Sequence, residues 1–169
     1  GWSLLVLFAC YATASGMSEA DARLRLAKAG VSLWPTNVEA NPYAPPYSYL
    51  KQGADATFKL YLRDESRTNI SMLADIPISD LTLDCPQLVD ITPVARLPLR
   101  ELSLTCRPDA NISVVKGMPL RSLGIACLRT RDLSGLAGMP LQRLWFNPYV
   151  VTNGLDIIAA SPQLEFIVT

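Results

Sequence analysis

The chain of 169 residues contains no histidine. Histidine is the commonest general base and metal ligand, so its absence excludes Ser-His and Cys-His catalytic arrangements. An excess of one charge is also lacking, because 15 basic residues balance 15 acidic ones. Nucleic-acid-binding proteins normally carry a concentrated basic excess, so we expect no nucleic-acid partner. Phosphate-binding glycine loops, paired-carboxylate sites and metalloprotease motifs are absent as well. We therefore expect no enzyme activity, no catalytic residue, no cofactor and no metal.

A long hydrophobic run is missing too. The apolar stretch at residues 2–14 is shorter than the about 20 residues that a transmembrane helix needs. Residues 12–14, Ala-Thr-Ala, fit a signal-peptide cleavage site, so we interpret 1–14 as a signal peptide or the remnant of a membrane anchor. Three forms stay open: a cleaved signal, a bacterial lipobox with Cys10 acylated, and the end of a membrane helix. Each form places the rest of the chain outside the cytoplasm, as a secreted, periplasmic or surface-anchored protein.

What the sequence does contain is a repeat of 21 residues. Its repeats begin with a proline, then an apolar residue, two variable residues and an apolar–x–apolar alternation, at Pro77, Pro98, Pro119 and Pro140. Side chains alternate across a strand, so each repeat predicts one short strand. Apolar residues spaced three apart follow, and they predict one turn of 3-10 or α-helix. Units of this kind bury their apolar faces by stacking into a solenoid with a small parallel sheet.

The phrases L-x-x-L-x-L at 99–104 and L-x-x-L-x-F at 141–146 resemble leucine-rich repeats. More narrowly, DITPVARLPL at 90–99 and DLSGLAGMPL at 132–141 resemble a bacterial short-repeat subtype with the phrase D-[LI]-S-P-L-x-G-M-P-L. The resemblance implies an α/β leucine-rich-repeat solenoid, with a parallel sheet on the concave face and helical or 3-10 turns on the convex side. It also implies one of two settings. These are a secreted protein, or the sensor portion of a receptor-like serine/threonine kinase whose kinase domain lies upstream.

The repeat divides the chain into four expected segments. They are the leader 1–14, an N-terminal helix and Pro/Tyr-rich capping segment 15–55, five repeats 56–161, and a C-terminal capping strand 162–169. Terminal units must shield the core, so we expect the aromatic residues of the second segment to cover the open end. The alternative is that this segment is an exposed Tyr/Pro ligand for a partner. The aromatic residues concerned are Trp34, Tyr43, Tyr47 and Tyr49.

Two further residue types recur with the same spacing. Cys85, Cys106 and Cys127 should stack in neighbouring strands, and such a linear ladder does not converge on one metal ion. We interpret these cysteines as buried free thiols, and the alternative is a disulfide between two of them. Hydroxyl residues also recur where the N-cap of each turn is expected, at Ser71, Thr92, Ser113 and Ser134.

The variable strand positions define the candidate binding surface. Their side chains would line the concave face, where such scaffolds bind partners. Both ends of this surface carry an arginine and an aromatic residue, which are types enriched in interface hot spots. We predict a monomeric, non-catalytic module that binds a protein or peptide partner, with an N-terminus that can attach to a membrane. The contact patch is expected at Tyr61, Arg63, Arg143 and Trp145. The alternative is that these four side chains only pack against the caps.

Overall fold

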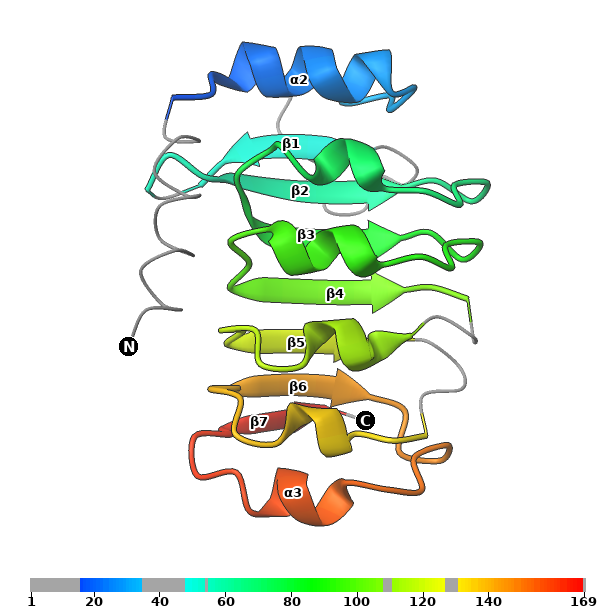
Figure 1. The fold of residues 1–169 in the computed structure, drawn as a ribbon, viewed down its shortest axis with the longest axis vertical. Coiled ribbons are helices and arrows are strands. Elements are labelled where there is room, and N and C mark those ends of the chain that lie inside the picture. The colour runs from blue at the N-terminus through cyan, green and yellow to red at the C-terminus, as the bar shows by residue number, and fades with distance from the viewer. Residues whose placement is uncertain (1–15, 35–47, 54, 108–110, 127–130, 169) are drawn as a thin grey trace.

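The computed structural model describes residues 16–34, 48–53, 55–107, 111–126 and 131–168, which form a mixed α/β fold (Figure 1). One layer is a seven-stranded sheet whose strands follow the chain order, and short helical turns form the other layer. A helix lies at each end of the stack. In chain order the elements are α2 (Glu19–Lys28), β1 (Tyr49–Gln52), β2 (Phe58–Arg63), η1 (Ser71–Leu73), β3 (Ile78–Asp84), η2 (Thr92–Arg96), β4 (Glu101–Thr105), η3 (Ile112–Val115), β5 (Ser122–Ile125), η4 (Ser134–Leu136), β6 (Arg143–Phe146), α3 (Leu155–Ala159) and β7 (Phe166–Val168).

The 21-residue spacing of the sequence is also the register of the sheet. Strands β2 to β7 run parallel. From β2 to β6, one leucine in each strand pairs with the equivalent leucine of the neighbouring strand. Parallel neighbours require a crossover connection, and here each crossover passes through a turn of the second layer. The successive partners are Leu60, Leu81, Leu102, Leu123 and Leu144. The predicted parallel sheet is therefore confirmed.

The core lies between the sheet and the turns. Alternate strand residues face it, so Leu81 and Leu83 are buried while Thr82 between them is half-buried. The turns contribute apolar residues three apart, and those of η1, η2 and η4 are at most 3% exposed. They are Ile70, Leu73, Ile91, Val94, Leu133 and Leu136. Both predicted periodicities, two for the strands and three for the turns, are confirmed.

The capping of the turns differs from the prediction. In each turn the side chain two positions before the hydroxyl residue accepts a hydrogen bond, at 2.6 to 3.0 Å, and the backbone N–H of the hydroxyl residue donates it. The acceptors are Asn69, Asp90, Asn111 and Asp132. The expected hydroxyl caps are therefore wrong, because the Thr92 hydroxyl donates to Asp90 and does not accept from the turn. Short Asn and Asp side chains readily form such a turn with the backbone two residues on.

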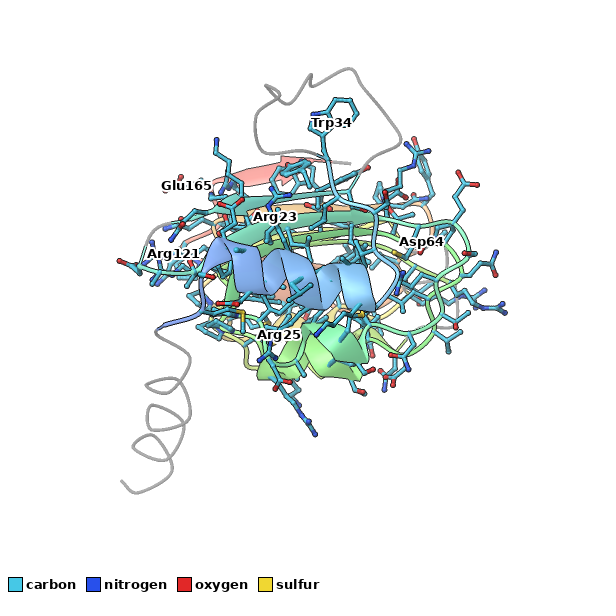
Figure 2. The ribbon with its side chains drawn as sticks, turned by 90° about the horizontal axis from the view of Figure 1, so that it is seen from above. Arg23, Arg25, Trp34, Asp64, Arg121 and Glu165 are labelled. Carbon is cyan, nitrogen blue, oxygen red and sulfur yellow. The ribbon has the colours of Figure 1, made fainter. Side chains whose placement is uncertain are left out.

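The N-terminal end of the sheet is covered by α2. Ser18 accepts a hydrogen bond from the Asp21 N–H at 3.1 Å, and Gly30 ends the segment with a φ of +75°. Ala22 and Leu26 lie on the inner side of this helix and are fully buried. Arg23 holds the helix to the sheet side by donating to the carbonyls of Trp34 and Leu50 (Figure 2). The helix therefore closes the core at this end.

An antiparallel strand was not predicted in this region. β1 pairs with β2 in the opposite direction, which places Tyr49 beside Tyr61. Tyr49 therefore lies on a sheet face and stacks on Tyr61, instead of covering the end of the stack as expected. Tyr43 and Tyr47 lie outside the described residues.

The C-terminal end departs from the 21-residue spacing. Leu144 pairs with Ile167, 23 positions further on. Gly154 precedes α3 with a φ of +88°, and a Cβ there would lie 2.5 Å from the backbone nitrogen of Ser134. Only glycine allows so close an approach of two backbones. The predicted closing strand is present as β7, and the helix α3 precedes it.

The cysteines follow the prediction in part. Cys85 is a buried free thiol whose Sγ lies 3.7 Å from the Leu62 carbonyl oxygen. Cys106 is also buried, but it is disulfide-bonded, and the other cysteine of this bond lies outside the described residues. A ladder of three free thiols is therefore wrong at Cys106. The leader predicted for 1–14 also lies outside the described residues. In the described part of the chain, no helix combines the length and hydropathy that a membrane span needs.

Candidate binding surface on the open face of the sheet

The sheet has one face packed on the turns and one opposite face, which we call the open face. Its side chains form three rows that run across the strands, because equivalent positions pair in register. The first row is Lys59, Asp80, Glu101, Ser122 and Arg143. The second row is Tyr61, Thr82, Ser103, Gly124 and Trp145. The third row is Arg63, Asp84 and Thr105.

The charges of the first row are paired within the row. The Lys59 ammonium lies 2.8 Å from Asp80, and Arg143 donates to Glu101 at 2.5 Å across the intervening strand β5. The hydrogen bond with Asp80 raises the pKa of Lys59. Burial alone would raise the pKa of Asp80, but hydrogen bonds from Lys59 and Ser79 outweigh it and lower that pKa. The cation at each end of the row is therefore paired with a carboxylate of the same row.

The N-terminal end of the open face is an aromatic and ionic cluster. The Tyr61 and Tyr49 rings stack with centroids 5.5 Å apart and planes inclined by 15°. Burial raises the pKa of Tyr61, whose hydroxyl lies 3.5 Å from a carboxylate oxygen of Asp84. Arg63 lies 3.5 Å from the same carboxylate and 3.7 Å from Glu65. Tyr61 and Arg63 are therefore held by neighbouring side chains and are only half-buried.

The C-terminal end of the open face is formed by Arg143 and Trp145. Trp145 is 37% exposed, which is unusual for a large apolar side chain in a strand. The Arg143 guanidinium lies 6.0 Å from the centroid of the Trp145 ring, at the outer limit of a cation–π contact. The same arginine reaches Glu101, so its orientation over the ring is fixed by an ion pair.

Between the two ends lies a shallow depression of about 470 Å³. It extends from Tyr49 on β1 to Trp145 on β6, and hydroxyl and charged side chains line most of it. They include Asp80, Thr82, Glu101, Ser103 and Ser122. The surface therefore offers aromatic contact at both ends and hydrogen-bonding groups between them.

A larger hollow of about 630 Å³ lies elsewhere, between α2 and the turn layer. It contains the partly exposed Leu24 and the ion pair of Arg25 with Asp75 at 3.5 Å. Arg25 and Asp75 are both well exposed, and such pairs contribute little energy. Among the described residues that line this hollow there is no aromatic side chain, so we take the open face as the candidate site.

The predicted patch is on one face but is not one cluster. Tyr61 and Arg63 lie on β2, whereas Arg143 and Trp145 lie on β6, four strand spacings or about 19 Å away. The alternative of packing against a cap fits Tyr61, which stacks on β1. It does not fit Trp145, which borders the depression. Sequence reasoning missed the contributions of Tyr49 and Glu101, and the outward position of Glu101 was the available signal.

Among the described residues, no group of three or more Cys, Asp or Glu side chains is arranged to hold a metal ion. Comparison with protein-family models, with curated proteins and with solved structures found no match. The proposed function therefore rests on the chemistry of the open face.

Proposed function

We propose that the chain is a leucine-rich-repeat solenoid that binds a protein or peptide partner on its concave face, which is the open face defined above. It acts as a non-catalytic module outside the cytoplasm. The observation that carries the proposal is the exposed Trp145 beside Arg143, at the border of the depression. Trp, Tyr and Arg are the residues that most often dominate binding energy in protein interfaces.

The arrangement of the repeats supports a solenoid. Each repeat adds one strand with a register of 21 residues and one turn on the other layer. Such stacks present variable strand positions on an extended surface, which is how repeat proteins bind partners. Within each row, the side chains differ strongly in charge and size from one strand to the next. This variation is expected of a surface that recognises a partner and not of a surface that packs in a core.

The disulfide at Cys106 supports the proposed location. Disulfides form and persist in oxidising compartments and are rare in the cytosol. A free and buried Cys85 is compatible with the same environment, because burial protects the thiol from oxidation.

A peptide selection tests the proposal. A random-peptide phage library is selected on the folded protein, and enriched peptides are measured by fluorescence polarisation. We expect the double variant R143A/W145A to weaken their binding by about tenfold or more, the scale of interface hot spots. Y61A/R63A should weaken it less, because those side chains are engaged by Tyr49 and Asp84.

The matched control is Tyr149→Ala, which removes a 95% exposed aromatic side chain outside the sheet. It should leave binding unchanged. Circular dichroism shows whether each variant is folded. The proposal fails if no peptide is enriched, or if R143A/W145A binds every enriched peptide as the wild type does.

A further inference from the structure

The hydroxyl residues at the start of the turns are used differently in different repeats. In each turn only the backbone N–H of the hydroxyl residue donates to the Asn or Asp two positions earlier. Where that residue is Asp, the hydroxyl bonds to the carboxylate as well. Thr92 donates to Asp90 at 2.6 Å. A hydrogen bond from the Ser134 hydroxyl likewise lowers the pKa of Asp132.

The two repeats with Asn leave their hydroxyls unused. Ser71 and Ser113 are exposed, and neither hydroxyl bonds to any residue that the structure describes. Their backbone N–H groups donate to Asn69 at 2.6 Å and to Asn111 at 3.0 Å. Every residue except proline has such an N–H, so the turn does not require serine at these two positions. The fold therefore explains the hydroxyls of the Asp repeats but not those of the Asn repeats.

The same two asparagines present an unused amide nitrogen. Asn69 and Asn111 are exposed, and the oxygen of each amide is the atom that accepts from the turn. Within the described part of the chain, neither Nδ2 donates a hydrogen bond. Asn153 differs, because its Nδ2 lies 3.1 Å from Asp132. Each site thus combines an exposed amide nitrogen with an exposed hydroxyl two residues further on.

This combination is the acceptor motif for N-linked sugars. The motif is Asn, then any residue except proline, then Ser or Thr. Residues 69–71 and 111–113 are both Asn-Ile-Ser, and no other asparagine of the sequence has Ser or Thr two positions on. A motif that also marks a turn can be structural alone, but the turn uses neither the serine hydroxyl nor Nδ2. These are the two groups on which sugar attachment depends.

We propose that Asn69 and Asn111 are N-glycosylation sites whose sugar donor is a lipid-linked oligosaccharide. A bond forms between Nδ2 and the anomeric carbon of the first sugar, and the bond from that carbon to the lipid phosphate breaks. The amide nitrogen loses one proton, and the lipid phosphate is the leaving group. The amide oxygen takes no part, so the hydrogen bond that holds the turn is kept.

The sugars would leave the binding surface uncovered. Asn69 and Asn111 come directly before the turns η1 and η3, which belong to the layer opposite the open face (Figure 1). This inference rests on the location outside the cytoplasm that is part of the proposed function. It adds a covalent modification, and it predicts that the turn side carries sugar while the open face stays free for the partner.

Glycopeptide mass spectrometry of the protein isolated from the cells of its natural source tests the inference. We expect sugar on both asparagines. Ser71→Ala and Ser113→Ala, produced in the same cells, should each abolish the sugar at their own site, because the motif loses its hydroxyl. The turn should persist in both variants, because alanine keeps the backbone N–H that donates to the asparagine. Circular dichroism checks the fold.

A second pair of variants removes the acceptor nitrogen itself. Asn69→Asp and Asn111→Asp should also lack sugar and stay folded, since Asp90 and Asp132 accept the same hydrogen bond in other repeats. Asn147→Asp is the matched control. Asn147 accepts from the backbone N–H two residues on at 3.0 Å, as in the turns, but proline and tyrosine follow it. It should carry no sugar, and its substitution should leave both sugars in place.

The outcomes separate this inference from the proposed function. If the protein recovered outside the cytoplasm has unmodified Asn69 and Asn111, glycosylation is wrong and the binding face stands. Sugar that persists in the Asn→Asp variants would be attached elsewhere and would also overturn the inference. Retention of an unmodified protein in the cytoplasm would refute the proposed location as well. Loss of the sugars should leave the affinity for the enriched phage peptides unchanged, and a fall would overturn their placement away from the open face.

Discussion

Arg143 on β6 donates a hydrogen bond to Glu101 on β4, although a whole strand lies between them. The bridge is possible because Ser122, the intervening residue of the row, is too small to obstruct it. Arg143 and Glu101 side chains are 43% and 44% exposed, so the pair is largely solvated. It therefore orients the arginine over Trp145 more than it stabilises the fold.

Glu101→Gln should consequently lower the free energy of unfolding by less than about 1 kcal/mol, the usual range for exposed pairs. Urea denaturation measures this. Asp55→Asn is the matched control, because it breaks the exposed pair with Arg100 at 2.9 Å, away from Arg143. A loss of several kcal/mol for Glu101→Gln alone would mean that the bridge is a stabilising element of the sheet.

The two faces of β3 should respond very differently to truncation. Leu83 is fully buried, so Leu83→Ala should lower the free energy of unfolding by about 2–5 kcal/mol through the cavity it leaves. Thr82→Ala, one position away on the open face, should change it by about 0.5 kcal/mol or less. Guanidinium denaturation followed by circular dichroism gives both values. Equal losses would contradict the assignment of the faces.

The Asp residues of the turns should make stability depend on pH. Hydrogen bonds from the Thr92 hydroxyl and backbone lower the pKa of Asp90, and those from Ser134 lower the pKa of Asp132. This contribution is present above the ordinary carboxyl pKa of about 4 and is lost as pH falls through the lowered value.

Asp90→Asn with Asp132→Asn should keep the turns, because Asn69 and Asn111 already make the same hydrogen bond in other repeats. The double variant should match the wild type at neutral pH and lose less stability between about pH 5 and pH 2. Thermal unfolding across this range checks the prediction. If the double variant and the wild type lose stability equally as the pH falls, these two carboxylates do not contribute to the pH dependence of stability.

The thiol of Cys85 should be unreactive in the folded protein. Burial raises the pKa of Cys85 to about 11, and only the thiolate reacts with iodoacetamide. Peptide mapping by mass spectrometry should find Cys85 unmodified after treatment at about pH 8 and modified after unfolding in guanidinium. Rapid modification without denaturant would place this cysteine at the surface.

The sheet could be predicted because one spacing determines its register. Leu102 and Leu123 are 21 residues apart in the sequence and pair in the structure, and the same arithmetic holds from β2 to β6. The antiparallel β1 follows no such spacing. It occurs once, next to a proline-rich stretch, and only its pairing with β2 makes Tyr49–Gln52 a strand.

The residues that lie on the open face could be predicted more readily than the contacts that they make. Outward parity identifies Arg143 and Glu101 as residues of one row, but their contact depends on side-chain length and on the small Ser122 between them. The separation of Tyr61 from Trp145 follows from counting strands, which the sequence allows. The disulfide at Cys106 could not be predicted from the spacing. Equal spacing places each cysteine of the ladder beside its neighbours alike, so it does not indicate which cysteines are bonded and which stay free.

We propose that the open face, and not the turn layer, binds the partner. A photo-crosslinking amino acid, p-benzoylphenylalanine, replaces Thr82 on the open face or Ala95 in η2 of the turn layer. Each protein is irradiated with an enriched phage peptide and analysed by mass spectrometry. We expect a covalent adduct from the Thr82 position and none from the Ala95 position. Crosslinking from Ala95 without crosslinking from Thr82 would contradict it.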